Sequence, residues 1–274
     1  MFSPSAVLFI VPIVRNNIMP ETQHSCQVIE NRKVGSVYYR LAFDAPVLAG
    51  AAQPGQFVHI RVSEGLEPLF RRPFSIYRAQ DGRVEIFYEP VGKGSRLLVQ
   101  KKKGDLLNVL GPLGRSFTPP GKDVRQIVFI GGGIGVAPFM LFSDRIKTHQ
   151  AGKILLYGGR SKAHTFAMTE FRRNGVRPLI ATDDGSVGVK GRVSELFSQI
   201  EISPETMIYT CGPRPMMAAV AAFAKANSLR GEASMEEVMA CGLGACLGCS
   251  IPTSRGYRTV CHDGPVFPLE ELVF

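Results

Sequence analysis

Short apolar runs separated by glycine and proline turns fill the chain between residues 23 and 122. Along residues 57–62 the side chains alternate between two faces, which is the two-residue period of a β-strand. The runs that predict strands are Ser36–Phe43, Gln56–Val62, Phe74–Arg78, Val84–Pro90 and Leu106–Leu110. Several short strands at this spacing are typical of a closed β-barrel.

The pattern changes to alternating strands and helices after Val124. Residues 126–130 form a continuous apolar run that leads directly into the glycine loop 131–138, and a helix is expected over 137–150. Later strands are expected at Lys153–Tyr157, Pro178–Thr182 and Thr206–Thr210, and helices at Met168–Arg173, Val193–Gln199 and Arg214–Asn227. A strand, a glycine loop and a helix in this order predict a Rossmann-like parallel α/β domain.

The nucleotide fingerprint of this second domain is incomplete. Val136 stands where the last glycine of a G-x-G-x-x-G loop belongs. The strand that ends at Tyr157 is followed by no acidic residue that would bind a ribose hydroxyl in the usual way. Arg160 and Lys162 in the next loop would suit a 2′-phosphate instead. The sequence therefore predicts a nicotinamide nucleotide site and leaves NAD and NADP open.

Four cysteines near the C-terminal end have a spacing that is typical of a metal cluster. Cys241, Cys246, Cys249 and Cys261 follow the pattern C-x4-C-x2-C and then a gap of eleven residues. Plant-type two-iron two-sulfur proteins use this spacing, and the three intervening glycines permit the inward N–H groups that a cluster needs. Zinc, disulfides and ordinary buried thiols are the competing interpretations. Cys26 and Cys211 lie far from this group and are interpreted as ordinary thiols.

Two segments of the barrel offer groups that suit a flavin nucleotide. The first, Arg71–Tyr77, brings a cation for a pyrophosphate, an aromatic ring and a hydroxyl onto one strand. The second, Val91–Ser95, follows a strand with two glycines and a lysine, whose N–H groups and charge suit a phosphate. The first segment alone would fit a surface arginine pair beside a core phenylalanine equally well. The two segments together favour an anion site.

Composition and charge narrow the function classes. The chain has 274 residues, of which 45% are apolar and 20% charged, and its net charge is +9. It has no stripe of basic and aromatic residues, so we expect phosphate-bearing cofactors rather than nucleic acid. Residues Ala6–Val14 are apolar but too few to span a membrane. Four cysteines in a cluster motif favour a reducing, cytoplasmic environment.

The three parts in this order resemble the ferredoxin–NADP reductase superfamily, and within it the electron-transfer subunit of dihydroorotate dehydrogenase B. The resemblance extends from about Gln23 to the C-terminus, and its most specific motif is Glu236–Cys249. It implies a multidomain β and α/β fold. Residues 1–22 would be an N-terminal extension, 23–122 a six-stranded antiparallel FAD-binding barrel, 123–230 an NAD-binding α/β domain and 231–274 a small 2Fe-2S cluster domain.

The resemblance also implies roles for individual residues. FAD would be bound by Arg72, Pro73, Phe74 and Ser75 and by Gly92, Lys93, Gly94 and Ser95. NAD would be bound by Gly133, Gly135, Val136, Pro138, Gly158, Arg160, Cys211, Gly212 and Pro213, with Cys211 near the nicotinamide. The cluster would be ligated by Cys241, Cys246, Cys249 and Cys261. No catalytic acid or base is expected, and the histidines (His24, His59, His149, His164 and His262) are expected at the surface or hydrogen-bonded in the core.

The function that this resemblance implies is electron relay. An FMN-containing catalytic subunit would oxidise dihydroorotate, with two copies of each subunit, and electrons would pass through the 2Fe-2S cluster and FAD of this chain to NAD⁺. Rivals with the same cofactors are the flavoprotein subunit of an NAD(P)H–ferredoxin oxidoreductase, a hydrogenase-type diaphorase subunit and an oxygenase reductase. In the first two, the resemblance implies that aspartate often replaces the first cluster cysteine, which is Cys241 here. A zinc-containing regulatory subunit is the rival of another class.

Residues 1–18 match nothing in the family, and we expect a disordered extension or a mis-assigned start before Met19. Deleting residues 1–18 should leave the flavin content, the iron content and the melting temperature of the purified chain unaltered. Loss of folding in the shortened chain would contradict this interpretation.

Overall fold

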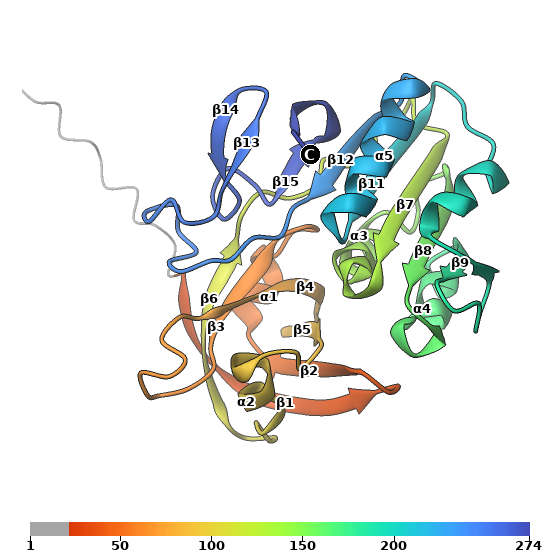
Figure 1. The fold of residues 1–274 in the computed structure, drawn as a ribbon. Helices are drawn as coiled ribbons and strands as arrows, with labels where there is room; N and C mark the ends of the chain where they lie inside the picture. The colour runs from red at the N-terminus through yellow and green to blue at the C-terminus, as the bar shows by residue number, and fades with distance from the viewer. Residues whose placement is uncertain (1–21) are drawn as a thin grey trace, which may run out of the picture.

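The computed structural model describes residues 22–274 and arranges them in three parts (Figure 1). A β-barrel comes first, an α/β sheet follows, and a small segment with a β-hairpin carries the C-terminal cysteines. The expected extension over residues 1–22 lies outside the described residues except for Thr22. Within residues 22–274, no helix has the length and apolar character needed to cross a membrane.

The first part is a closed barrel of antiparallel strands, as the sequence predicts. Its strands are β1 (Gln23–Val34), β2 (Tyr38–Asp44), β3 (Phe57–Arg61), β4 (Arg72–Gln80), β5 (Arg83–Tyr88) and β6 (Leu106–Leu113), in the order β1-β2-β5-β4-β3-β6. Two short helices, α1 (Pro46–Ala51) and α2 (Lys93–Val99), lie between strands. The strand list from the sequence omits β1, because most of its side chains are polar and only Cys26 and Val28 are buried.

The second part is a sheet in the order β10-β9-β8-β7-β11-β12-β15. Its strands are β7 (Gln126–Gly132), β8 (Gly152–Gly159), β9 (Val176–Thr182), β10 (Val189–Lys190), β11 (Thr206–Cys211), β12 (Arg230–Ser234) and β15 (Val266–Pro268). The helices are α3 (Pro138–Arg145), α4 (Met168–Arg173) and α5 (Arg214–Ala226). All neighbouring strands are parallel except β12 and β15. Both faces of the sheet are packed, which explains the apolar runs in its central strands.

Two helices differ from their predicted form. The helix expected over 137–150 ends at Arg145. Residues 193–199, expected to be an α-helix, form a 3₁₀ helix, and four of these seven residues are weak helix formers: Val193, Ser194, Phe197 and Ser198. Val193 also packs closely on the backbone of Gly158, where a Cβ atom would lie 2.9 Å from the Val193 Cβ. Packing on the sheet therefore sets the shape of this segment.

The segment after residue 230 is built into the edge of the same sheet. Strand β12 pairs in parallel with β11, and β15 returns antiparallel along β12. Between these two strands lie the cysteine loop and a hairpin of β13 (Ser250–Thr253) and β14 (Gly256–Thr259). The cysteine segment expected as a separate small domain is thus flanked on both sides by strands of the α/β sheet.

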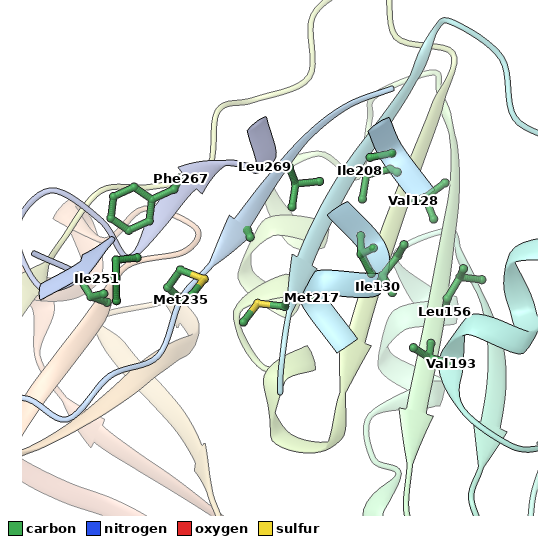
Figure 2. Packing of buried hydrophobic residues seen from close by; sticks show 14 of the residues in the cluster. Val128, Ile130, Leu156, Val193, Ile208, Met217, Met235, Ile251, Phe267 and Leu269 are labelled. Atoms are coloured by element: carbon green, nitrogen blue, oxygen red, sulfur yellow. The ribbon is translucent and has the colours of Figure 1, made fainter. Parts of the chain in front are cut away.

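One hydrophobic core continues from the sheet into the cysteine segment. Figure 2 shows Val128, Ile130 and Ile208 of the sheet beside Met217 of α5. The same core continues through Met235 to Ile251 and Phe267 (Figure 2) and includes Cys249, Cys261 and two barrel residues, Phe57 and Leu113. Burial of this shared apolar surface stabilises all three parts against one another.

The barrel and the α/β part are also joined by charged side chains. Arg78 of β4 donates from Nε to Asp144 of α3 at 2.9 Å and from Nη1 to Glu170 of α4. These three side chains are only 16–25% exposed, so solvent screens the ion pairs weakly.

Replacing Arg78 by methionine should lower the free energy of unfolding by about 2 kcal/mol, because two partly buried carboxylates lose their counter-ion. Urea denaturation of the purified chain measures the change. The matched control is Arg32→Met, which removes a pair with Glu30 whose members are 48% and 46% exposed. That control should change stability by less than about 0.5 kcal/mol. Equal losses in the two variants would contradict a bridging role for Arg78.

Candidate functional site

The four cysteines of the C-terminal motif meet around one loop. Cys241, Cys246 and Cys249 lie between β12 and β13, and Cys261 follows β14. Cys249 and Cys261 are buried in the shared core, Cys241 is half-buried, and Cys246 is exposed at the loop surface. The structure therefore brings together thiols that are up to twenty residues apart, as the spacing predicts.

Each of these four sulfurs accepts a hydrogen bond from a backbone N–H. The donors are Leu243 to Cys241 at 3.4 Å, Gly244 to Cys261 at 3.1 Å, Gly248 to Cys246 at 3.5 Å and Cys261 to Cys249 at 3.4 Å. Gly242 and Gly244 have φ values of +72° and +80°, which let successive N–H groups turn inward. Donors of this kind stabilise thiolates and metal-bound sulfur.

The thiols stand in two pairs. Although burial acts in the opposite direction, hydrogen bonds from the loop backbone and from Cys246 lower the pKa of Cys241 to about 6. Burial and the neighbouring Cys249 raise the pKa of Cys261 to about 12. Cys241 thus lies beside Cys246, and Cys249 beside Cys261.

This paired arrangement fits a two-iron cluster, in which each iron takes two protein sulfurs. A structural zinc ion would instead need four ligands around one point. The geometry of the loop therefore favours the iron–sulfur interpretation over zinc. No disulfide forms among the six cysteines, all of which are free.

The two barrel segments expected at the flavin touch each other. A Cβ atom at Gly94 would lie 2.7 Å from Nε of Arg72, so this glycine allows α2 to approach the arginine. Arg72 donates to the carbonyl groups of Phe70 and Arg71 and has no carboxylate partner within residues 22–274. Its charge is therefore available to a phosphate.

The rest of the expected flavin set surrounds this contact. Pro73, Phe74 and Ser75 are half-buried on β4, and the ring of Phe74 lies 5.8 Å from that of Tyr88. Ser95 Oγ accepts the N–H of Gly92 at 3.1 Å and fixes the first turn of α2. Lys93 forms an exposed ion pair with Glu67.

A cleft of about 620 Å³ lies at the carboxyl ends of the parallel strands. Of the residues expected at the nicotinamide nucleotide, those that line it are Gly133, Gly135, Gly158, Arg160, Gly212 and Pro213. Val136, Pro138 and Cys211 do not line it, because they are buried behind the glycine loop. Ligands of open α/β sheets bind at this position.

The residues behind the loop shape its backbone. A Cβ atom at Gly131 would lie 2.4 Å from a methyl carbon of Val136, and one at Gly135 would lie 2.5 Å from the Cys211 carbonyl oxygen. Complete burial raises the pKa of the Cys211 thiol well above its usual value. Cys211 is accordingly a neutral thiol beneath the cleft, separated from its surface by the backbone.

Several cleft residues are missing from the sequence-based set. The barrel contributes Tyr38 and Glu89, and the sheet contributes His164, Asp183 and Glu236. Asp183 follows the end of β9, the third strand of this part along the chain, whereas the ribose-binding acid of the usual pattern follows the second strand, so that pattern did not single out Asp183 in the sequence. The contribution of Tyr38 and Glu89 depends on how the barrel packs on the sheet, which no local pattern indicates.

The expectation for the histidines is wrong for His59. His59 is fully buried, and neither ring nitrogen has a hydrogen-bond partner within the described chain. Burial lowers its pKa to about 4. The others are as expected, with His24, His149 and His164 in hydrogen bonds and His262 largely exposed. The alternation along the strand indicates which face His59 lies on, but it does not indicate whether a distant segment covers that face or offers a hydrogen-bond partner.

A barrel, a nucleotide cleft and a thiol loop of this geometry define a flavin- and nicotinamide-linked electron-transfer protein. Two families match the chain: the oxidoreductase NAD-binding domain over residues 129–222, and the iron–sulfur cluster binding domain of dihydroorotate dehydrogenase B over residues 236–273. The second match spans all four cysteines of the loop.

Curated relatives match nearly the whole chain. The electron transfer subunit of dihydroorotate dehydrogenase B (NAD(+)) from Desulforamulus reducens is 38% identical over 86% of this chain and 92% of its own length. The protein of the same name from Geobacillus thermodenitrificans is 38% identical over 90% of this chain and 96% of its own length. The chain therefore belongs to the family of dihydroorotate dehydrogenase B electron transfer subunits.

Solved structures agree on the fold. The NADH-dependent reduced ferredoxin-NADP oxidoreductase superimposes with a TM-score of 0.80 at 26% identity, over 91% of this chain and 90% of that one. A ferredoxin NADP⁺ reductase from Neisseria gonorrhoeae, solved with FAD and NADP, superimposes with a TM-score of 0.65 at 18% identity. This match covers 75% of this chain and 92% of the reductase. The second likeness concerns the fold alone.

Cys249→Ala should abolish iron binding, because it removes one of four paired sulfurs from the loop. The flavin content should stay near the wild-type value, since the barrel segments that contact Arg72 are unchanged. Iron, sulfide and flavin analysis of the purified chain measures both quantities. The matched control is Cys26→Ala, a buried thiol of the barrel that should keep the iron. Full iron content in Cys249→Ala would contradict the ligand assignment.

Proposed function

We propose that this chain is the electron-transfer subunit of an NAD-dependent dihydroorotate dehydrogenase that serves pyrimidine biosynthesis. The observation that carries the proposal is the paired thiol loop, which lies beside the barrel and shares a core with the nucleotide-binding sheet. The relatives that cover most of the chain bear this name. The overall reaction converts dihydroorotate and NAD⁺ to orotate, NADH and H⁺.

The cofactors are FAD and a 2Fe-2S cluster, with NAD as the substrate. We assign FAD to the two touching barrel segments, the nicotinamide nucleotide to the cleft at the carboxyl ends of the sheet, and the cluster to the four paired cysteines. Each assignment is supported by groups that suit the ligand: Arg72, which has no carboxylate partner among residues 22–274, for a pyrophosphate, a glycine loop for a dinucleotide, and four N–H···S bonds for a cluster.

When bound, the cluster would supply single-electron transfer, and the flavin would couple pairs of these electrons to hydride transfer with NAD⁺. The protein supplies position and polarity. Arg72 and the N–H groups at the start of α2 neutralise phosphate charge. Gly133 and Gly135 line the nucleotide cleft without a side chain. The four loop N–H groups stabilise negative charge on sulfur. The carboxylates of Asp183 and Glu236 lie in the same cleft.

The partner that this function requires is a catalytic subunit that oxidises dihydroorotate. We propose that it contains FMN and that two copies of each subunit assemble. Electron transfer needs short distances, so the exposed side of the loop, which carries Cys246 and Leu247, is the side that must face this partner. We place the complex in the cytoplasm, where thiols stay reduced and available to iron.

The rivals with the same cofactors are less well supported. Identities of 35–38% to dihydroorotate dehydrogenase B subunits exceed the 26% to the ferredoxin-NADP oxidoreductase. The resemblance also implies that ferredoxin oxidoreductase flavoproteins and hydrogenase-type diaphorases often carry aspartate at the first cluster position, where this chain has Cys241. A zinc regulatory subunit does not explain the nucleotide cleft or the paired thiols.

The decisive experiment combines the purified chain with its catalytic partner. Under anaerobic conditions, dihydroorotate should reduce NAD⁺ only when both subunits are present, and the visible spectrum of this chain alone should bleach with NADH. A matched preparation of Cys249→Ala should lose partner-driven NAD⁺ reduction and keep most NADH-to-dye activity. Full partner-driven activity in that variant would refute the relay.

Arg72→Ala should lower FAD retention by at least tenfold, because a buried or half-buried arginine–phosphate contact contributes well over about 1.4 kcal/mol. The dissociation constant of FAD, measured by fluorescence titration of the flavin-free chain, checks this. Arg173→Ala changes an exposed arginine on α4 and should leave the constant unchanged. Equal constants in the two variants would refute the assignment of Arg72.

A further inference from the structure

His59 lies on β3, on the outer face of the barrel. Its neighbours Val58 and Ile60 point into the barrel core, whereas Phe57, two residues before it, joins the core shared with the cysteine segment. His59 is fully buried, and both of its ring nitrogens lack a hydrogen-bond partner within residues 22–274. Buried polar groups are nearly always paired in native proteins, so this side chain calls for an explanation.

The ring of His59 faces the cysteine loop. A Cβ atom at Gly242 would lie 2.5 Å from the ring Nδ1 and 3.2 Å from Cε1, so only a glycine fits against the imidazole here. The backbone groups of Arg71 and, with a smaller effect, of Cys241 lie near enough to act on the ring, although neither meets hydrogen-bond geometry. The imidazole thus abuts the loop beside the first cysteine of the motif.

The other side of His59 belongs to the flavin strand. His59 is directly opposite Pro73 in the pairing of β3 with β4, and Arg72 is opposite Ile60. Arg71, which precedes this motif, donates to the His59 carbonyl at 3.4 Å. One residue therefore contacts the cluster loop with its side chain, and the strand that carries the proposed flavin segment with both its backbone and its ring.

We propose that His59 is a positioning residue for the iron–sulfur cluster, whose Nδ1–H supplies polarity to the Cys241 end of the loop and fixes that loop against the flavin strand. The inference rests on the proposed function insofar as the loop holds a cluster. An N–H group near cluster sulfur raises the reduction potential of the cluster, and outer contacts of this kind orient metal ligands. An imidazole that only filled space would have neither effect.

The test compares two variants of the full chain loaded with FAD and iron. His59→Leu has a similar volume and no N–H, whereas His59→Asn places an amide near the position of Nδ1. Redox titration followed by electron paramagnetic resonance of the reduced cluster gives the midpoint potential. His59→Leu should lower the equilibrium constant for cluster reduction about tenfold, which is about 59 mV for a one-electron couple. His59→Asn should recover most of this shift, and both variants should keep their FAD.

A second pair of variants tests the contact from the loop side. Gly242→Ala forces a methyl group against Nδ1 and should shift the potential and the resonance spectrum of the cluster. Its control is Gly256→Ala, because Gly256 also has a positive φ of +91° but no atom within 4 Å of an added Cβ. The control should retain the wild-type potential.

The proposal is overturned if His59→Leu keeps the wild-type potential and spectrum, or if His59→Leu and His59→Asn shift the potential equally. It is also overturned if both His59 variants lose the cluster while they retain FAD, or if Gly242→Ala gives the wild-type signal. Loss of the cluster from His59→Leu with retention in His59→Asn supports it. A wild-type chain without iron and sulfide would refute the proposed function itself, so the two failures are distinguishable.

Discussion

The constraint on which the structure depends is the single hydrophobic core that runs from the parallel sheet into the cysteine segment. Electron transfer requires redox groups at fixed, short separations, and a flexible linker between the parts would not maintain them. The core contains Cys249 and Cys261 together with sheet residues such as Ile130 and the barrel residue Phe57. Because protein interiors are close-packed and barely compressible, this contact sets the relative positions of all three parts.

The cysteine loop adds a polar layer to that rigid base. Its glycines adopt conformations that turn N–H groups toward sulfur, and this costs backbone entropy that ordinary loops avoid. Two thiols are anchored in the core, and the other two lie nearer the surface. The loop therefore combines a fixed inner half with an outer half that is accessible to a second protein. His59 contacts the loop at the Cys241 end, close to Met239 of the shared core and away from the exposed Cys246.

Patterns among neighbouring residues predict the strands, the glycine loop and the cysteine loop, because these features depend on local interactions. The alternation around Val58 and the apolar run of β7 identify the barrel and the sheet, and the cysteine spacing identifies the loop. Strands β12 and β15 are short, and they belong to the sheet only through distant pairing with β11 and with each other. The same holds for the cleft, where Tyr38 arrives from the barrel, and for His59, whose burial depends on a loop about 180 residues later in the chain. Long-range packing leaves no signature in neighbouring residues.

The position of β15 has a consequence for how the chain matures. All six barrel strands are complete once Leu113 has been synthesised, but the sheet lacks its last strand until residues 266–268 follow, after all four cysteines of the loop. Domains fold during synthesis from the N-terminal side. The barrel can therefore form early, while the sheet edge and the thiol loop take their final form together at the end. A complete thiol loop therefore exists only in a chain whose barrel and central sheet strands have already been synthesised.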